Sequence, residues 1–351
     1  MELDERKRRV LSVIAEVYTQ TGEPVGSKLI AMRLNSAYSP ATIRNDMAAL
    51  FDLGLLEQPH TSAGRILSHL GYRVYVDDLM KLKPVSGTLR DNIEAMFNIR
   101  DPDPDKLLED AAKALAEITG CAVFTTALTP DDAVVQRIEL IPSGEHAVVM
   151  LVIASNGVVR SKVCRTSFQV TEQLLNFLRA FCRSRLVGVS LRDISQQYLN
   201  MVTVELGEYS RIFVPLFAAL FELCTEIYEG QYSCAGATNL LRYTASAQES
   251  HELLSFVERR ENVMRLLEHC RGAQTSVSIG KENQQAELQN SSVLISRYQV
   301  GRKGAGAIGL IGPIRMDYAA MISELEYFAR LMGELLTEIF EDRQQRDSGG
   351  D

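Results

Sequence analysis

The sequence predicts a multidomain α+β protein, and three observations support this fold class. Its 351 residues exceed one typical domain and suggest two or three. Residues 1–80 carry short amphipathic helix patterns and one hairpin pattern. Strand patterns then occur in two groups, at 122–165 and 275–312, with helix patterns between them. A sheet pattern that pauses for helices and then resumes is typical of a domain that carries an insertion.

Composition favours an ordinary globular protein and gives little support for binding nucleic acid through bulk charge. The net charge is -8, and residues 1–80 carry nine Lys and Arg against ten Asp and Glu. Any affinity for DNA must therefore come from the placement of basic residues and from two subunits that bind together.

No segment predicts a membrane protein or a disulfide framework. The N-terminus is charged from the second residue, and the apolar runs at 148–154 and 212–224 fall short of the ~20 residues that span a bilayer. The six cysteines lack CxxC spacing, which favours reduced packing residues. We expect a cytoplasmic protein without membrane contact.

Two helices are predicted ahead of the most informative segment. The first carries an apolar stripe that ends at the break Thr21-Gly22-Glu23-Pro24-Val25-Gly26. Ser27 can then cap a short second helix that extends to Leu34. The stripe of the first helix consists of Val10, Leu11, Ile14, Val17 and Tyr18.

The third helix has the pattern of a helix that reads DNA. Ser39 suits the N-cap, Pro40 suits the first helical position, and Gly54 can end the helix in a left-handed turn. Apolar residues recur at three- and four-residue steps, so one face is predicted to be buried. The other face presents Thr42, Arg44 and Asn45, which can bond base edges and phosphates. The apolar positions are Ile43, Met47, Leu50 and Leu53.

A hairpin is predicted directly after this helix. Apolar arms at 55–56 and 66–67 flank a polar tip at 60–65. Three helices followed by such a hairpin predict a winged helix-turn-helix over residues 1–80, with Arg65 at the wing tip. Tyr72 and Tyr75 are expected to pack the following helix onto this unit.

These positions give a set of predicted DNA contacts, although each has an alternative as a solvated surface residue. Basic residues near the start of a helix are common on protein surfaces, so those in the first two helices are predicted only as possible phosphate contacts. The predicted DNA-binding residues are Ser39, Thr42, Arg44, Asn45, His60, Thr61, Ser62 and Arg65, and the possible phosphate contacts are Arg6, Arg9 and Lys28.

Several motifs resemble the HrcA family of heat-inducible transcription repressors. Two substitutions depart from the family pattern, because Leu67 and Ile314 stand where it usually has proline and threonine. Between about residues 80 and 270 the likeness is one of layout rather than motif. The motifs are Gly-Glu-Pro-Val-Gly-Ser at 22–27, Ala-Thr-Ile-Arg-Asn-Asp-Met at 41–47, Gly-Leu-Leu-Glu-Gln-Pro-His-Thr-Ser-Ala-Gly-Arg at 54–65, Gly-Tyr-Arg-Val-Tyr-Val-Asp at 71–77 and Gly-Leu-Ile-Gly-Pro-Ile-Arg-Met-Asp-Tyr at 309–318.

The resemblance implies a function and its partners. HrcA-like proteins are homodimeric repressors that block chaperone operons at an inverted repeat called CIRCE, lose activity on heating and are kept active by the GroE chaperonin. It also implies a GAF-like α/β domain that contains an inserted dimerising segment. Double-stranded DNA with an inverted-repeat operator, a second copy of the chain and GroE are thus the expected partners.

The resemblance and the periodicity together suggest a domain layout. A hinge is expected between Lys81 and Gly87, where the periodic pattern stops. A long apolar helix in the insertion covers more surface than one contact face needs, which indicates packing within the subunit and against a partner. The predicted domains are 1–80 (winged helix-turn-helix), 88–200 (GAF-like, first part), 201–271 (inserted dimerisation segment), 272–341 (GAF-like, second part) and 342–351 (flexible tail), and the predicted dimerisation residues are Phe213, Leu216, Phe217, Leu220 and Phe221.

Other chemistry is weakly indicated. Residues 304–309 match GxGxxG, but they precede a strand instead of opening a helix, so we predict a turn between strands and no dinucleotide site. Cys234, His251, His269 and Cys270 lack the close pairs of a zinc site. No nucleophile or phosphate-loop motif occurs, so we expect no enzyme activity, metal or cofactor.

Two rival functions remain open from the sequence. The first is a small-molecule-responsive transcription regulator that uses the GAF-like domain as a sensor. The second is a nucleotide-dependent enzyme with a vestigial DNA-binding domain, which depends on the glycine run at 304–309. Ligand screening would separate the first from the repressor, and a test for dinucleotide binding would separate the second.

Overall fold

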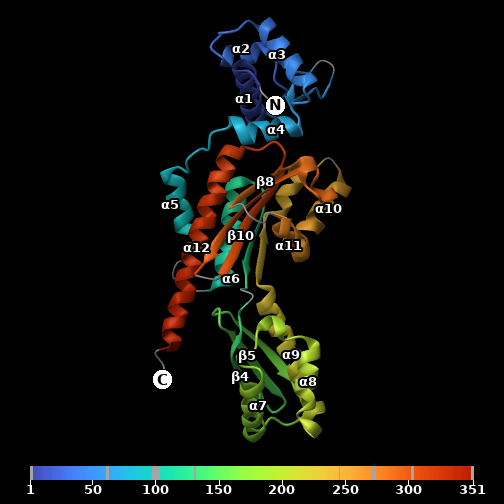
Figure 1. The fold of residues 1–351 in the computed structure, drawn as a ribbon, viewed down its shortest axis with the longest axis vertical. Coiled ribbons are helices and arrows are strands. Elements are labelled where there is room, and N and C mark those ends of the chain that lie inside the picture. Colours follow the sequence, from blue (N-terminus) through green and yellow to red (C-terminus); the bar gives the residue numbers. More distant parts are fainter. Residues whose placement is uncertain are drawn as a thin grey trace.

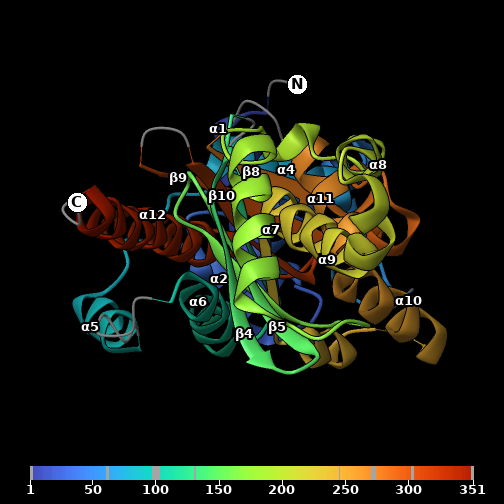
Figure 2. The same cartoon turned by 90° about the horizontal axis from the view of Figure 1, so that it is seen from below.

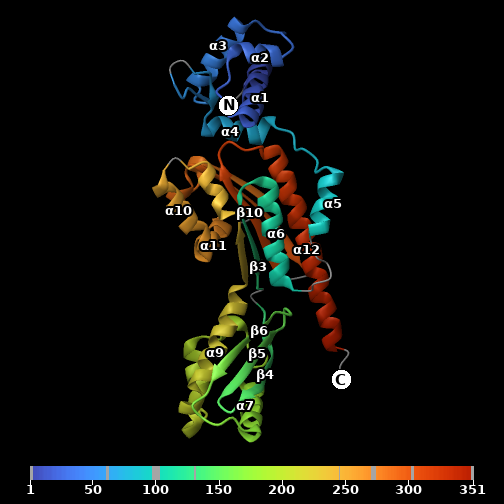
Figure 3. The same cartoon turned by 180° about the vertical axis from the view of Figure 1, so that it is seen from behind.

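The computed structural model consists of three units stacked along one axis (Figures 1 and 3). The N-terminal unit (residues 3–79) lies at one end, and the inserted unit (135–229) lies at the other. Between them lies the central unit (87–128 and 231–348), which contains the larger sheet. The structure describes residues 3–60, 63–96, 103–129, 132–244, 246–269, 274–301 and 304–348.

The N-terminal unit forms the helices and hairpin that its sequence predicts. The Asp4 side chain caps the first helix and the Ser39 side chain caps the third, while Gly54 has a φ of 74° just beyond that helix. One detail differs, because Gly26 rather than Ser27 is the N-cap of the second helix. The elements are α1 Glu5–Thr21, α2 Ser27–Arg33, α3 Pro40–Asp52, β1 Leu56–Glu57, β2 Ile66–Leu67, α4 His69–Val74 and the π-helical η1 Tyr75–Leu79.

The central unit is built on a five-stranded antiparallel sheet with the strand order β7-β3-β10-β9-β8. Helices α6 and α12 cover one face, whereas α10 and α11 cover the other (Figure 2). The strands are β3 Ala122–Leu128, β7 Gln231–Ala235, β8 Thr275–Ile279, β9 Ser291–Val300 and β10 Gly304–Pro313. The helices are α5 Gly87–Met96, α6 Pro104–Thr119, α10 Ala247–Glu258, α11 Arg260–His269 and α12 Tyr318–Ser348.

The inserted unit has a three-stranded antiparallel sheet of its own, in the order β4-β5-β6. Alternate residues of β5 are buried under α7 and α9. The elements are β4 Val135–Gly144, β5 Ala147–Ala154, β6 Val159–Arg165, α7 Glu172–Arg185, α8 Gln196–Val204 and α9 Ser210–Glu229. Short 3₁₀ helices complete both units at Leu191–Asp193, Gly207–Tyr209, Ala237–Arg242, Gly280–Glu282 and Ala286–Leu288.

This division differs from the sheet layout that the sequence suggested. The strands between 135 and 165 do not belong to the sheet that resumes at β8, and α10 and α11 pack on the central sheet instead of within an insertion. Strand periodicity predicts a strand but not its partners, because both groups of strands show similar apolar runs. The exact domain boundaries stay a prediction.

The predicted dimerisation residues are mostly internal. Phe213, Leu216, Phe217 and Leu220 are at most 5 % exposed, and Phe221 is partly buried against the same core. The Phe213 ring meets the Phe168 ring edge-on at a centroid distance of 5.6 Å. Helix α9 is apolar on several sides because the sheet and neighbouring helices of its own unit cover those sides, while its remaining side, with Val214 and Glu222, is exposed.

Two further predictions about the C-terminal part are corrected. The glycine run at 304–309 lies within β10 and not in a turn. A Cβ at Gly306 would overlap the Tyr298 ring and the Thr126 carbonyl, so glycine is needed for close packing inside the sheet. Helix α12 continues to Ser348 instead of ending near residue 341, since the intervening sequence contains no helix breaker.

The N-terminal unit contacts the central unit before the chain reaches the predicted hinge. Residues 81–86 are neither helix nor strand, as predicted, but α4 already packs on β8. We call these contacts the junction. It comprises Tyr18, Gly22, Tyr72 and Arg73 on the N-terminal side and Val277, Glu282, Arg315 and Tyr318 on the central side.

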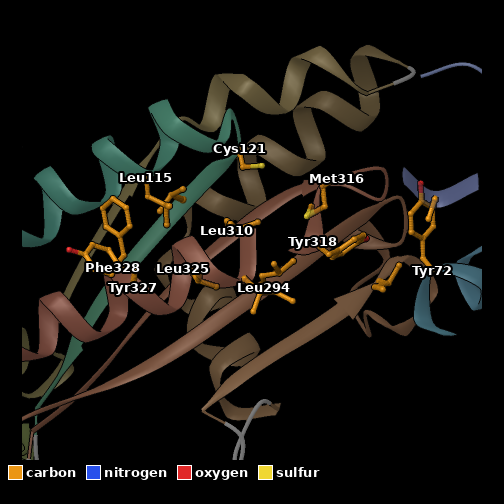
Figure 4. Packing of buried hydrophobic residues seen from close by; sticks show 14 of the residues in the cluster. Tyr72, Leu115, Cys121, Leu294, Leu310, Met316, Tyr318, Leu325, Tyr327 and Phe328 are labelled. Carbon is orange, nitrogen blue, oxygen red and sulfur yellow. The ribbon is translucent and has the colours of Figure 1, made fainter. Parts of the chain in front are cut away.

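Buried aromatic rings form the core of the junction (Figure 4). Tyr72 and Tyr318 are at most 2 % exposed, and their ring centroids lie 5.8 Å apart. Tyr75 is half-buried against the same core. Both tyrosines therefore pack as predicted instead of facing solvent, and the helix that carries Tyr75 contacts α1. The ring that Tyr72 meets, however, belongs to the central unit.

The junction predicts an acid-sensitive contribution to stability. Burial acts to raise the pKa of Glu282, but hydrogen bonds from Arg73 and from the Ile279 N–H outweigh it, so the pKa lies below its ordinary 4.5. A carboxylate whose pKa is lowered by folding stabilises the folded protein at pH values above the pKa of the unfolded state. This stabilisation is lost as pH falls through the pKa of the folded state.

We expect Glu282→Gln to be less stable than the wild-type chain at about pH 7, and we expect this difference in unfolding free energy to shrink as pH falls below the ordinary 4.5. Urea unfolding of both chains at each pH measures it. A constant difference would contradict this prediction.

Candidate nucleic-acid interface

Helix α3 presents a polar exposed face at the end of the molecule farthest from the inserted unit (Figures 1 and 3). Arg44 and Asn45 are exposed, whereas Ile43 and Leu50 on the opposite face are fully buried. No hydrogen bond or ion pair to another described residue involves the Arg44 side chain. This face can therefore offer its guanidinium and amide groups to a ligand.

The first turn of α3 is held by Ser39. Its Oγ accepts a hydrogen bond from the Thr42 N–H at 3.1 Å and lies 2.9 Å from Thr42 Oγ1. Both predicted contact residues thus have a structural role, because they satisfy groups at the helix start.

A buried carboxylate fixes α3 against α1, and the sequence reading missed it. Asp46 is 4 % exposed and accepts two hydrogen bonds from Arg6, at 2.6 Å from Nε and 3.0 Å from Nη2. Asp46 lies one turn from Ile43 and one turn from Leu50 on the buried face, and this spacing could have identified it. The predicted phosphate contact of Arg6 stays a prediction, and only Nη1 and the second N–H of Nη2 are left to donate to a phosphate.

The other possible phosphate contacts lie on the surface. Arg9 Nε donates to Glu5 Oε1 at 3.1 Å, and more than half of the Arg9 side chain is exposed. Lys28 is exposed in the first turn of α2. Neither residue is needed for packing, so both are compatible with a contact to a phosphate backbone.

The hairpin residues that were predicted to contact DNA lie in different environments. His60 is exposed, whereas Thr61 and Ser62 lie outside the described residues. Arg65 is not at the tip, because its N–H and carbonyl pair with Val25 at 2.9 Å, next to the start of β2. Its guanidinium lies over the Phe51 ring with Cζ 4.8 Å from the centroid, so any DNA contact would come from the hairpin base.

The predictions about metal ligands, membrane contact and cysteines concern the rest of the described chain. No group of three or more His, Cys, Asp or Glu side chains gathers among the described residues, and Cys270 lies outside them. Of the described helices, none combines the length and apolarity needed to cross a membrane. Four of the five described cysteines are buried and all five are free thiols.

Substitutions of Ser39 should separate capping from DNA contact. We expect Ser39→Ala to lower the unfolding free energy by about 1 kcal/mol, since it leaves an N–H at the helix start without its partner. Ser39→Asp keeps the cap and should preserve stability, but its charge should weaken binding to any duplex. Thermal unfolding and duplex titration measure the two effects, and equal binding by Ser39→Asp and the wild type would contradict the contact.

A family model described as the HrcA protein C-terminal domain matches residues 105–322 of this chain. Whole-chain relatives agree with it. The heat-inducible transcription repressor HrcA of Moorella thermoacetica is 34 % identical over 346 residues, covering 97 % of this chain and 100 % of the relative. The repressor of the same name from Symbiobacterium thermophilum is 34 % identical over 339 residues, covering 95 % and 98 %.

A solved structure has a similar overall fold. It is titled as the crystal structure of a hypothetical protein at 2.2 Å resolution, and it aligns with a TM-score of 0.70 and 26 % identity. The alignment covers 96 % of this chain and 100 % of the other. The arrangement of all three units is thus not peculiar to this sequence.

Proposed function

The chain belongs to the HrcA family of heat-inducible transcription repressors, and from this premise we propose that it represses chaperone operons by binding the CIRCE inverted repeat as a homodimer. The family is one of repressors and not of enzymes, so the chain is a negative regulator of transcription. The proposal concerns the operator, the dimer and the manner of release.

The exposed face of α3 carries the proposal. In a winged helix-turn-helix, the third helix enters the major groove and the hairpin lies beside it on the backbone. Arg44 and Asn45 would then bond base edges, while Thr42, Ser39 and the hairpin residue His60 would bond phosphates. The support is the exposure of Arg44 and Asn45 on a helix whose other face is fixed by Ile43 and Asp46.

An inverted repeat calls for two copies of this helix related by a two-fold axis. We place the subunit contact on the outward face of the three-stranded sheet instead of on α9. Val149 pairs with Ile141 on one side and with Val163 on the other, and Ile153 pairs with Val159. Ile141 is 49 % and Val163 64 % exposed, so this face offers an apolar patch, beside the ion pair of Arg137 and Glu139, that a second copy can cover.

Release on heating fits the thermodynamics of such a dimer. A dimer that binds DNA only when folded and associated loses its operator as soon as heat shifts either equilibrium. A chaperonin such as GroE would restore the repressor after stress and fail to do so while occupied by other unfolded chains. A dimer that stays folded and bound to DNA through a heat-shock temperature step would refute this account.

A gel-shift titration tests the proposed function directly. The full-length chain is titrated against a CIRCE-type inverted repeat, a scrambled duplex of the same composition and a single half-site, all at one stated salt concentration. We expect specific binding at least ~10³-fold tighter than nonspecific binding. Equal affinity for the repeat and the scrambled duplex, or a monomeric protein bound to the full repeat, would reject the proposal.

A further inference from the structure

We propose that the junction holds α3 at a fixed angle to the rest of each subunit, and that Arg73 and Arg315 are positioning residues which select the spacing between the two halves of the operator. This inference rests on the proposed function. It assigns a role to the motifs at 71–77 and 309–318, which do not lie on the α3 face.

The two motifs meet through Tyr72 and Tyr318, although some 230 residues separate them in the chain. Arg73 of the first motif bonds a third segment, at 277–282. Arg73 Nε donates to Glu282 Oε1 at 2.8 Å, and its Nη2 donates to the Val277 carbonyl at 2.7 Å and also bonds Glu282 Oε2. Its Nη1 donates to Asp77 Oδ1 at 3.1 Å. Each of the three guanidinium nitrogens therefore donates a hydrogen bond. A planar group held at three nitrogens fixes the orientation of the N-terminal unit on the central unit as well as the distance between them.

Arg315 fixes a second point, on the first helix of the N-terminal unit. Its Cζ lies 5.6 Å from the centre of the Tyr18 ring, and Nη1 lies 3.4 Å from the Tyr18 carbonyl. That carbonyl belongs to the last turn of α1, where a positive charge is favoured. A Cβ on Gly22, which has a φ of 74°, would overlap this guanidinium.

The buried pair Tyr72–Tyr318 is a third contact of the junction, beside the two polar ones. Rotation of the N-terminal unit about any one of these contacts would disturb the other two. The irregular segment 81–86 comes after α4 in the chain. Because α4 itself packs on β8, this segment does not free the N-terminal unit from the central unit.

The arrangement of the units explains why this angle matters for DNA. Helix α3 and the inserted unit lie at opposite ends of the molecule, with the junction between them (Figures 1 and 3). In a dimer joined through the inserted units, the two α3 helices are related only through both junctions. Adding one base pair between half-sites moves them apart by about 3.4 Å and turns them by about a tenth of a helical turn. A rigid junction accepts few such changes, whereas a loose one accepts several.

The test uses full-length protein and a series of inverted repeats whose spacers differ by single base pairs, together with an isolated half-site. The variants are Arg73→Ala, Arg73→Lys and Arg315→Ala. Lysine keeps the charge that could attract DNA but cannot form the fork with Glu282. Arg179→Ala is the matched control, because Arg179 also bonds a backbone carbonyl and a carboxylate, yet entirely within the inserted unit.

For the wild type and Arg179→Ala, we expect the best spacer to be preferred over its neighbours by about tenfold or more. The three junction variants should reduce this preference to about twofold while half-site affinity stays unchanged. Junction variants that keep the wild-type spacer profile, or that lose affinity equally for every duplex including the half-site, would overturn the inference. If the wild type itself does not prefer the inverted repeat to a scrambled duplex, the proposed function has failed instead.

Discussion

Replacing Arg44 with alanine is expected to weaken binding to the inverted repeat by about 1–3 kcal/mol for each half-site, if its guanidinium bonds a base edge. Two half-sites that act independently would roughly double the loss in the dimer. Stability should change by less than about 0.5 kcal/mol, because Arg44 is exposed and does not pack in the core. Titration of the variant against matched and base-substituted repeats measures the effect.

The base-substituted repeats decide how Arg44 acts. A base contact predicts a loss that disappears when the contacted base pair is changed, whereas a phosphate contact predicts a uniform loss on all duplexes. Arg33→Ala is the control, since it removes the same charge from an exposed position at the end of α2. Equal losses for Arg33→Ala and Arg44→Ala on every duplex would show that charge alone is responsible.

Replacing Phe213 with alanine is expected to lower the unfolding free energy by about 3–5 kcal/mol. Phe213 is fully buried, and its ring packs against Phe168 and Phe177, so truncation leaves a cavity in the inserted unit. Urea unfolding at several protein concentrations measures this loss. A residue at a subunit interface would instead affect the dissociation constant and leave the fold of the isolated subunit intact.

Val163→Glu is the complementary variant, because Val163 is 64 % exposed on the outward face of the three-stranded sheet. A carboxylate there should prevent the proposed association, since burying an unpaired charge is costly. Sedimentation should then show monomers with an unchanged far-UV spectrum. If Val163→Glu stays dimeric while Phe213→Ala becomes a folded monomer, the subunit contact lies on α9 after all.

The N-terminal unit was predictable because its signals are local. The Ser39 cap, the apolar spacing of Ile43, Met47 and Leu50, and the turn at Gly54 each involve residues within a few positions of one another. Helix and hairpin formation depends mainly on such near neighbours, so α1, α2 and α3 and the hairpin appear where the patterns place them.

Features that depend on distant partners were not predictable in this way. The spacing of Asp46 is compatible with the buried face of α3, but its partner Arg6 lies 40 positions away and is not signalled locally. Arg65 was expected at the wing tip, but its pairing with Val25 draws it to the hairpin base. In both cases the residue type is compatible with either location, and only the residue that pairs with it determines which location it takes.

By itself, the sequence determined the family, the repressor function and the helix that exposes a polar face, because motif order and periodicity are properties of the chain alone. Only the tertiary structure decided that β4, β5 and β6 form a separate sheet, that the apolar residues predicted for dimerisation on α9 are buried within their own unit, and that the motifs at 71–77 and 309–318 join two units. The physical reason is that apolar periodicity specifies which face of an element is buried, whereas the surface that buries it depends on residues far away in the chain.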